Sequence, residues 1–335
     1  MISRQLHGLK VARRLFLPAT MAVVCLASAA RGDLINFNPT GGVTTAGGFN
    51  PGTLSNIAGL NFGSGDAVAV GAITPGQGLV VGTNFTLYYQ TRLVALNLSD
   101  GSVFVPAGLN AANGFQITEV AAFRETVTSV VNGTATFQVA GGPSAVNIYF
   151  EDLARPGAVP ANAATGAGFI PPASAGFQIF GSSVTSEFSN FTDTTVANGL
   201  PRVALDPLNP TGKYAGVMTE QGQGGVTLNT AANFVNTAFF QTPGISISQF
   251  SSDVKVPFSA IPASALFNDP FSGTLSINPN LGTINGVNGT DFAFQISGAA
   301  QSFAVPEPAS VALTLLGFGG MTFGSFVARR RRAQV

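Results

Sequence analysis

The stretch GFQITEVAAFRETVTSVVNGTATFQVA, residues 114–140, is the part of the chain that decides its fold. Residues 114–131 are rich in Thr and Val and are long enough for one bent strand or two short ones. Asn132-Gly133 is a dipeptide favoured in two-residue hairpin turns, and residues 135–140 continue with partly alternating apolar and polar side chains. The stretch therefore predicts an antiparallel hairpin.

Similar patterns recur on the C-terminal side of this hairpin. Further strands are expected at residues 145–152, 177–183, 273–279 and 291–297. Many short strands separated by turn signals predict an all-β body, residues 31–304, built as a β-sandwich or a jelly-roll-like fold. The Pro-, Ala- and Gly-rich residues 155–176 are either a long loop or the seam between two halves of this body.

The composition fits an exported β-protein better than a cytosolic enzyme. Only 9% of the 335 residues are charged, 41 are glycine and none is tryptophan. Turns of extracellular β-proteins use Gly and Asn, and their strands use β-branched residues. The 28 phenylalanines spread along the chain supply enough apolar surface for a core, which argues against disorder.

The N-terminus has the layout of a secretory signal peptide. Its first 15 residues carry basic side chains and no acid, and an apolar run follows at residues 16–30; the basic residues are Arg4, Lys10, Arg13 and Arg14. Small residues place signal peptidase cleavage after Ala29 or Ala30, so that residues 1–30 are removed.

Cleavage at this place would remove both Cys25 and His7, the single cysteine and the single histidine of the chain. Cysteine nucleophiles, Ser-His-Asp triads, zinc sites with thiolate or imidazole ligands and disulfides are then excluded together. We therefore expect no catalytic residues, no metal site and no cofactor.

The C-terminus combines three features in strict order. An uncharged run at residues 309–328 is long enough, at about 1.5 Å per residue, to cross a hydrocarbon core of about 30 Å as a transmembrane helix. The cluster after it consists of Arg329, Arg330, Arg331 and Arg332, and the positive-inside rule keeps this cluster in the cytoplasm. The peptide before it consists of Val305, Pro306, Glu307 and Pro308, whose prolines favour an exposed, non-helical conformation outside the bilayer.

This order resembles the PEP-CTERM sorting signal of Gram-negative and related bacteria, here over residues 305–332. The resemblance implies recognition by an exosortase, a membrane-embedded cysteine transpeptidase, which would cut near the motif. The protein would then be released or transferred to the cell surface or the extracellular matrix. The alternative is an ordinary single-span tail anchor, in which Pro-Glu-Pro is a spacer beside the membrane.

Removal of both terminal segments changes the charge of the chain. The precursor is formally neutral, whereas the body up to Glu307 has seven basic and 15 acidic residues, a formal charge of −8. Nucleic-acid binding is disfavoured, because contacts to phosphates need clustered Lys and Arg. Association with cations or with neutral polysaccharide is easier to accommodate.

The acidic residues offer poor candidates for catalysis. Glu151 and Asp152 are adjacent, so their side chains point to opposite faces of a strand, and we expect solvated charges at a strand end. Glu119 and Glu125 flank Arg124 in one strand, where a surface charge pair is expected. Asp291 follows a turn-rich run, but the spacing of a calcium-binding loop is missing.

Tyr88 and Tyr89 are candidates for contacts with a glycan, since tyrosines on an exposed strand face can stack on sugars; core packing is the competing expectation for one of them.

A second, weaker resemblance covers residues from about 85 to 195. The runs FTLYYQTRLVALN, GFQITEVAAFRETVTSVV, NIYFED and SSVTSEFSNFT are similar to flocculation-associated PEP-CTERM proteins, which are surface or matrix proteins that help cells aggregate with extracellular polysaccharide.

Together these features predict an exported surface or extracellular-matrix protein that is not an enzyme and has a structural or adhesive role in biofilm or floc formation. Its expected partners are signal peptidase, an exosortase, the membrane before processing and exopolysaccharide. Two alternatives are a carbohydrate-binding or carboxylate-dependent carbohydrate-active protein and a plain tail-anchored envelope protein. The hydrolase alternative requires two carboxylates about 5 to 10 Å apart in a cleft.

Overall fold

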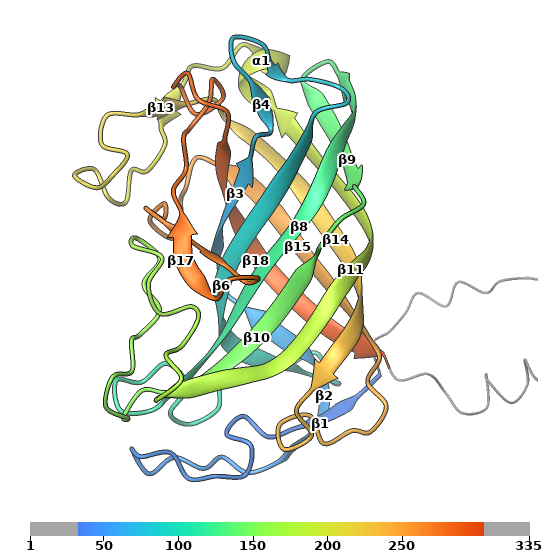
Figure 1. Cartoon of the computed structure of the whole chain (residues 1–335), viewed down its shortest axis with the longest axis vertical. Helices are drawn as coiled ribbons and strands as arrows, with labels where there is room; N and C mark the ends of the chain where they lie inside the picture. Colours follow the sequence, from blue (N-terminus) through green and yellow to red (C-terminus); the bar gives the residue numbers. More distant parts are fainter. Residues whose placement is uncertain (1–32, 305–335) are drawn as a thin grey trace, which may run out of the picture. The chain divides into compact units, whose positions relative to one another are not determined.

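The computed structural model describes residues 33–304, which form strands throughout and one short helix (Figure 1). The strands are β1 (Ile35–Phe37), β2 (Leu54–Phe62), β3 (Gly65–Val70), β4 (Ile73–Thr74), β5 (Gly78–Leu79), β6 (Asn84–Leu98), β7 (Val103–Phe104), β8 (Phe115–Val131), β9 (Thr134–Val139), β10 (Ala145–Asp152), β11 (Gly176–Asp193), β12 (Val203–Ala204), β13 (Met218–Thr219), β14 (Gly222–Val235), β15 (Ile247–Val256), β16 (Phe267–Asp269), β17 (Thr274–Ile277) and β18 (Phe292–Ala304). The helix is α1 (Thr194–Asn198), whose first turn is capped by the side chain of Asp193.

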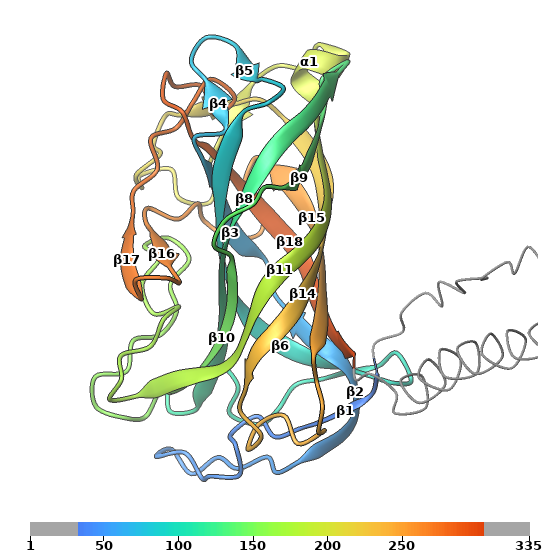
Figure 2. The same ribbon diagram turned by 45° about the vertical axis from the view of Figure 1, so that its right-hand side comes forward.

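The long strands form one antiparallel sheet that closes on itself as a cylinder. Following the pairings, the order runs β3, β6, β8, β10, β11, β14, β15, β18 and back to β3 (Figure 2). Neighbours in the cylinder are neighbours along the chain, apart from the closing pair of β18 with β3. This closure leaves no free sheet edge around the cylinder.

Two positions of the cylinder are each shared by two consecutive strands. Between β8 and β11, β10 fills one end of the position and β9 the other. Between β6 and β18, β3 and β2 divide the position in the same way. The breaks fall at residues 140–144 and at Gly63-Ser64, where the sequence is rich in Gly, Ser and Pro.

The predicted hairpin is confirmed. β8 and β9 pair antiparallel around Asn132-Gly133, and both turn residues have positive φ, 49° and 77°. Two central residues with positive φ match the right-handed twist of the flanking strands, which is why Asn-Gly is favoured there. The expected strands at 145–152, 177–183, 273–279 and 291–297 coincide with β10, β11, β17 and β18.

The all-β prediction is confirmed, but the expectation of a β-sandwich or jelly-roll-like body is wrong. A sandwich needs two sheets packed face to face, whereas here one sheet encloses the core. The reason lies in strand length: β6, β8 and β11 have 15, 17 and 18 residues, longer than sequence windows of four to eight residues indicate. Strands of this length can twist and bend around a shared interior.

The interior of the cylinder holds the main hydrophobic core, which is rich in phenylalanine. Phe180, Phe240 and Phe303 stack on one another near one end, with ring centroids 5.2 to 5.5 Å apart. β1 joins the same end, because Phe37 lies 5.0 Å from Phe240. Such aromatic pairs add to the burial of apolar surface.

The outer surface of the cylinder has two different parts. We call the outward faces of β3, β6, β8 and β10 the covered wall, because residues 153–175 and 257–269 pack on them. A small apolar cluster of Val120, Tyr149 and Phe169 joins the wall to the first of these loops. We call the outward faces of β11, β14 and β15 the bare wall. Of the two alternatives for residues 155–176, the structure shows a long loop that leads into β11 and not a seam between two halves of the body.

Candidate functional site

The structure separates the two predicted glycan-contacting tyrosines. Tyr89 points into the cylinder, is 3% exposed and packs on Phe250 with ring centroids 5.3 Å apart. Tyr88 points outward on the covered wall, where burial and the charge of Asp269 raise the pKa of its hydroxyl. Tyr89 is therefore a core residue that a glycan outside the cylinder cannot contact, whereas Tyr88 is half-buried.

Glu119 and Glu125 are not surface charges, as expected from the sequence, but interior residues. They are 0% and 3% exposed, because alternate residues of β8 face the core and both lie in phase with Phe123. Arg124, with the opposite phase, is exposed. Neither oxygen of Glu119 has a hydrogen-bond partner, and burial raises its pKa to about 8. Glu119 is therefore protonated at neutral pH.

Glu151 and Asp152 do point to opposite faces, but the expectation that they are solvated is wrong. They are 1% and 2% exposed. Glu151 accepts hydrogen bonds from the Val159 backbone N–H at 2.8 Å and from the Gln116 side chain. Asp152 accepts from the Ala46 backbone N–H at 2.8 Å and pairs with Arg155. Both carboxylates therefore hold loops against the cylinder. Their hydrogen bonds also offset the free-energy cost of burying charged groups.

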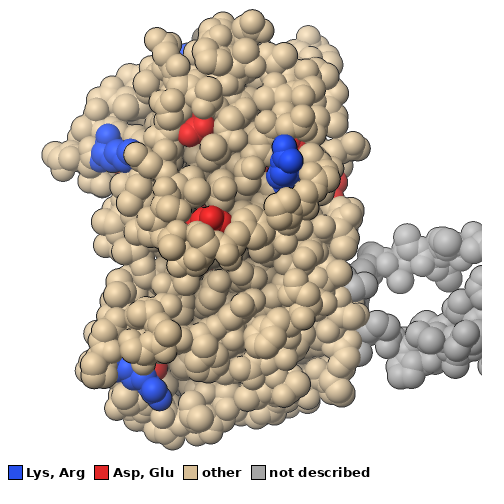
Figure 3. Space-filling view, viewed as in Figure 1, with Lys and Arg blue, Asp and Glu red and all other residues tan. Residues whose placement is uncertain are grey.

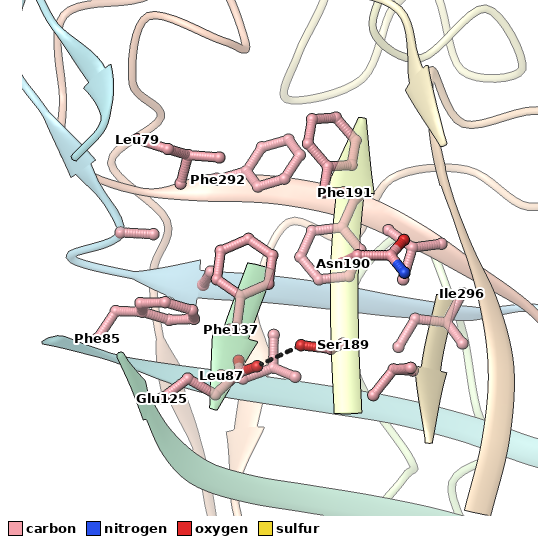
Figure 4. A pocket seen from close by; sticks show the side chains of 15 residues that line it. Leu79, Phe85, Leu87, Glu125, Phe137, Ser189, Asn190, Phe191, Phe292 and Ile296 are labelled. Carbon is pink, nitrogen blue, oxygen red and sulfur yellow. Dashed lines mark hydrogen bonds between the residues drawn. The ribbon is translucent and has the colours of Figure 1, made fainter. Parts of the chain in front are cut away.

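A small cavity inside the cylinder is lined by one carboxyl group, that of Glu125 (Figure 4). Its volume is about 40 Å³, and its lining is largely Phe, Leu, Val and Ala. Glu125 accepts a hydrogen bond from Ser189 Oγ at 3.1 Å. Burial raises the pKa of Glu125 well above its ordinary value, and the neighbouring carboxyl of Glu187 raises it further.

The cavity does not suit a sugar. A cavity of about 150 Å³ is needed to hold even a benzene ring. Glu187, whose carboxyl adjoins that of Glu125, does not line the cavity. The arrangement that would favour carboxylate-dependent hydrolysis is an open cleft between two separated acids, and this small cavity with one carboxyl group does not provide it.

A polar groove of about 760 Å³ lies on the outside of the cylinder, across the bare wall and β18. Its lining consists mainly of uncharged hydrogen-bonding side chains: Ser64, Asn190, Thr192, Gln223, Ser259, Gln295 and Ser297. Asp253 and Lys255 add one charge of each sign. The groove offers donors and acceptors without a net charge.

The bare wall around the groove has the same neutral character. Gln249 donates to Asn229 Oδ1 at 3.1 Å, and Asn229 donates to Ser186 Oγ at 3.0 Å. Phe188, two residues before the groove residue Asn190 on the same face of β11, is 68% exposed. Charged side chains are also sparse on the face shown in Figure 3.

The sparse surface charge follows from where the acids lie. Within residues 33–304, eight of the 14 acidic residues are buried: Asp66, Glu119, Glu125, Glu151, Asp152, Asp193, Asp206 and Asp291. The formal charge of −8 therefore overstates the negative charge that a ligand meets at the surface.

Asp291 organises its own loop. Its carboxylate accepts from the backbone N–H groups of Gly71 at 3.0 Å and Asn280 at 2.7 Å. Within residues 33–304, no three His, Cys, Asp or Glu side chains gather where they could hold a metal ion.

Neither the exposure of Phe188 nor the groove was predicted from the sequence. The run SEFSNF gives no sign that Phe188 is exposed while Phe191 is 2% exposed, because a bulge between Val184 and Ser186 sets the phase of the alternation. The other predicted site residues lie outside residues 33–304: Ala29, Ala30, Val305, Pro306, Glu307, Pro308, Arg329, Arg330, Arg331 and Arg332. Among the described residues, no helix has the length and apolar character needed to span a membrane.

Comparison with known proteins identifies the C-terminal segment. Residues 304–332 match the PEP-CTERM protein-sorting motif. The chain thus carries this motif, which indicates an exported protein made as a membrane-associated precursor and processed by an exosortase. No curated protein and no solved structure matches the chain.

Proposed function

We propose that the body of this protein is a non-enzymatic structural or adhesive component of the cell surface or extracellular matrix, which associates with polysaccharide during biofilm or floc formation. The observation that carries the proposal is the sorting motif at residues 304–332 together with a neutral, polar groove on the exported body. Signal peptidase and an exosortase remove the two ends, and exopolysaccharide is the partner outside the cell.

The chemistry of the bare wall supports a sugar polymer as partner. Hydroxyl and amide side chains can exchange hydrogen bonds with sugar hydroxyls without the cost of desolvating charges. Phe188 places an exposed aromatic ring beside Asn190, where the apolar face of a sugar can stack on it. A groove open along the cylinder wall accommodates a chain, whereas the closed interior does not.

The first experiment tests sorting. We expect intact mass analysis and fractionation of the native host to show, outside the cell, a species that lacks residues 1–30 and the arginine cluster. This species should disappear when the exosortase is deleted. If the arginine cluster stays attached in the membrane fraction of both strains, the protein is a plain tail-anchored envelope protein and the matrix role is refuted.

The second experiment tests polysaccharide binding by the protein recovered from the host. Affinity electrophoresis in gels containing the host's own exopolysaccharide should retard it. Phe188→Ser should weaken this retardation about three- to tenfold, the range expected for one lost aromatic contact. Phe271→Ser is the matched control, because Phe271 is 48% exposed and does not line the groove. Absence of retardation would count against the proposal.

Degradation of the same polysaccharide distinguishes the carbohydrate-active alternative. Release of reducing ends by the recovered protein would support that alternative. We expect none, because the interior cavity that Glu125 lines has no space for a sugar.

A further inference from the structure

Besides the groove, a smaller pocket lies where the covered wall meets the loops that pack on it. Its volume is about 80 Å³. Ser64, Asp66 and Arg92 line it from the cylinder, and Phe169 and Ile261 line it from the two loops. It therefore joins polar groups on one side to apolar surface on the other.

Asp66 is buried with one oxygen unused. The residue is 0% exposed; Oδ1 accepts a hydrogen bond from the Ser264 backbone N–H at 3.0 Å, and Oδ2 has no partner. Burial raises the pKa of Asp66 well above its ordinary value, and the charge of Asp206 contributes to the rise. The other titratable or charged groups facing it are Tyr214 and Arg92. A protonated Oδ2 in this place is a donor without an acceptor.

Arg92 also has unused hydrogen-bonding capacity. Asp66 pairs with Gln90 in the ladder between β3 and β6, so Arg92 is its diagonal neighbour on the same outer face. Nevertheless, the ion pairs among residues 33–304 are Arg155 with Asp152 and Arg202 with Glu220, and neither includes Arg92. Its guanidinium, on an exposed residue at the pocket, is available for an anion.

The pocket continues the groove on the bare wall. Ser64 lines both of them. The loop between β15 and β16 also borders both, because Ser259 and Ala260 line the groove and Ile261 lines the pocket. A polymer lying in the groove can thus present one of its units to Arg92 and Asp66.

We propose that this pocket takes the carboxylate group of an acidic sugar residue in a polysaccharide, with the carboxylate between Arg92 and Asp66 and the sugar ring outside the pocket, in the adjoining groove. The inference rests on the proposed association with polysaccharide and adds its chemical class. The raised pKa of Asp66 favours its uncharged form, which can donate to the sugar carboxylate instead of repelling it, and the neutral groove accommodates the rest of the polymer.

Alginate oligosaccharides of four to six residues are the probe, and the same oligosaccharides with their carboxyl groups reduced to alcohols are the matched neutral control. Isothermal titration of the protein recovered from the host should detect the acidic oligosaccharides. Arg92→Gln should weaken their binding about 10- to 100-fold, the effect of one charge-assisted hydrogen bond of about 1.5 to 3 kcal/mol. Arg124→Gln is the control, since Arg124 is an exposed cation of the cylinder that does not line the pocket.

Asp66→Asn provides a second variant that preserves the shape of the side chain. In the unaltered protein, acidic-oligosaccharide binding should weaken as pH rises through the raised pKa of Asp66, because ionisation places a negative charge beside the ligand carboxylate. The Asn variant should keep its affinity over the same range, since an amide does not ionise. Equal loss of affinity in both would overturn the role of Asp66.

The results separate failure of this inference from failure of the proposed function. Equal binding of acidic and reduced oligosaccharides, or equal effects of Arg92→Gln and Arg124→Gln, would overturn the acidic-sugar pocket while polysaccharide association stands. Binding of free amino acids that depends on Arg92 and Asp66, without oligosaccharide binding, would also overturn it. If the host's own polysaccharide is not bound either, the proposed function itself is refuted.

Discussion

The covered wall and the bare wall are outer faces of the same sheet, yet they are built from different chemistry. Under the loops, the wall is rich in buried groups with specific partners, such as Gln90, Gln116 and Glu151. On the bare wall, Ser, Thr, Asn and Gln form hydrogen bonds at the surface, as in the Gln249, Asn229 and Ser186 series. This chain therefore uses polar groups under its loops to fix structure and leaves a neutral, hydrogen-bonding surface open to solvent on the bare wall.

The largest effect should come from Gln90 on the covered wall. Its side-chain nitrogen donates to Ser264 Oγ at 3.1 Å and to the Leu266 carbonyl at 3.2 Å, and its oxygen accepts both the backbone and side-chain N–H groups of Asn268. Gln90→Leu leaves these buried groups without partners, so we expect a loss of about 3–5 kcal/mol in the free energy of unfolding.

Urea denaturation measures this loss, and the same substitution on the bare wall is its control. Gln249→Leu should cost less than about 1 kcal/mol, because water replaces the partner of a half-exposed side chain. Similar losses at Gln90 and Gln249 would contradict the distinction between the walls.

Glu119 extends the comparison to the interior. Its pKa in the folded protein, about 8, is above the value near 4.5 of an exposed glutamate, so the folded state holds a proton that the unfolded state releases between these pH values. The free energy of unfolding should therefore fall by several kcal/mol as pH rises from about 4.5 to about 8 and change little from this source below that range.

Glu119→Gln should remove the part of this fall that Glu119 causes, since the neutral amide does not titrate, whereas buried Asp66 and Glu125, whose pKa values are also raised, keep their own contributions. Urea denaturation at intervals across the same pH range checks it. Asp253→Asn, which removes an exposed carboxylate beside the groove, should leave the fall in place. A parallel pH dependence in the Glu119→Gln variant and the unaltered protein would show that Glu119 is not its source.

Thr118 gives a smaller contrast. Its hydroxyl donates to the Phe169 carbonyl at 2.6 Å and so ties the first covering loop to β8. Thr118→Val keeps the shape and leaves the carbonyl without this donor, which should cost about 1–2 kcal/mol in thermal or urea unfolding. Thr227→Val on the bare wall should be within about 0.5 kcal/mol of the unaltered protein; a cost as large as that at Thr118 would be unexpected.

The smallest effect should come from Asn229, although it takes part in two side-chain hydrogen bonds. Asn229→Ala should change the free energy of unfolding by about 0.5 kcal/mol or less, because the groups involved are open to water. Urea denaturation tests this. A loss above about 2 kcal/mol would mean that the surface hydrogen bonds of the bare wall are structural after all.

Local signals made part of this structure predictable. Asn132-Gly133 and the alternation on either side of it located β8 and β9, and the sorting motif could be read because it is a linear pattern. Closure of the sheet could not be predicted in this way, because pairs such as Phe292 with Ala69 join strands far apart in the chain. Neither residue carries a sign of its partner.

The inward orientation of Glu119 and Glu125 had a signal that the charge-pair expectation overlooked. Both glutamates are in phase with Ile117, Ala121 and Phe123, all of which face the core. An acid at such a position is usually read as the solvent face, since burying it costs free energy unless it is neutral or paired. Here protonation makes the interior position acceptable, and a sequence pattern does not report protonation.

The position of β18 has a mechanical consequence for a protein held through its C-terminal side. The strand ends at Ala304, where the sorting motif begins, and it is hydrogen-bonded to β15 on one side and to β2 and β3 on the other. Near its end, Phe303 is locked between Phe180 and Phe240. Tension applied from its C-terminal side would therefore load a strand with hydrogen-bonded neighbours on both sides, so that detaching it has to break both ladders and open the closed sheet.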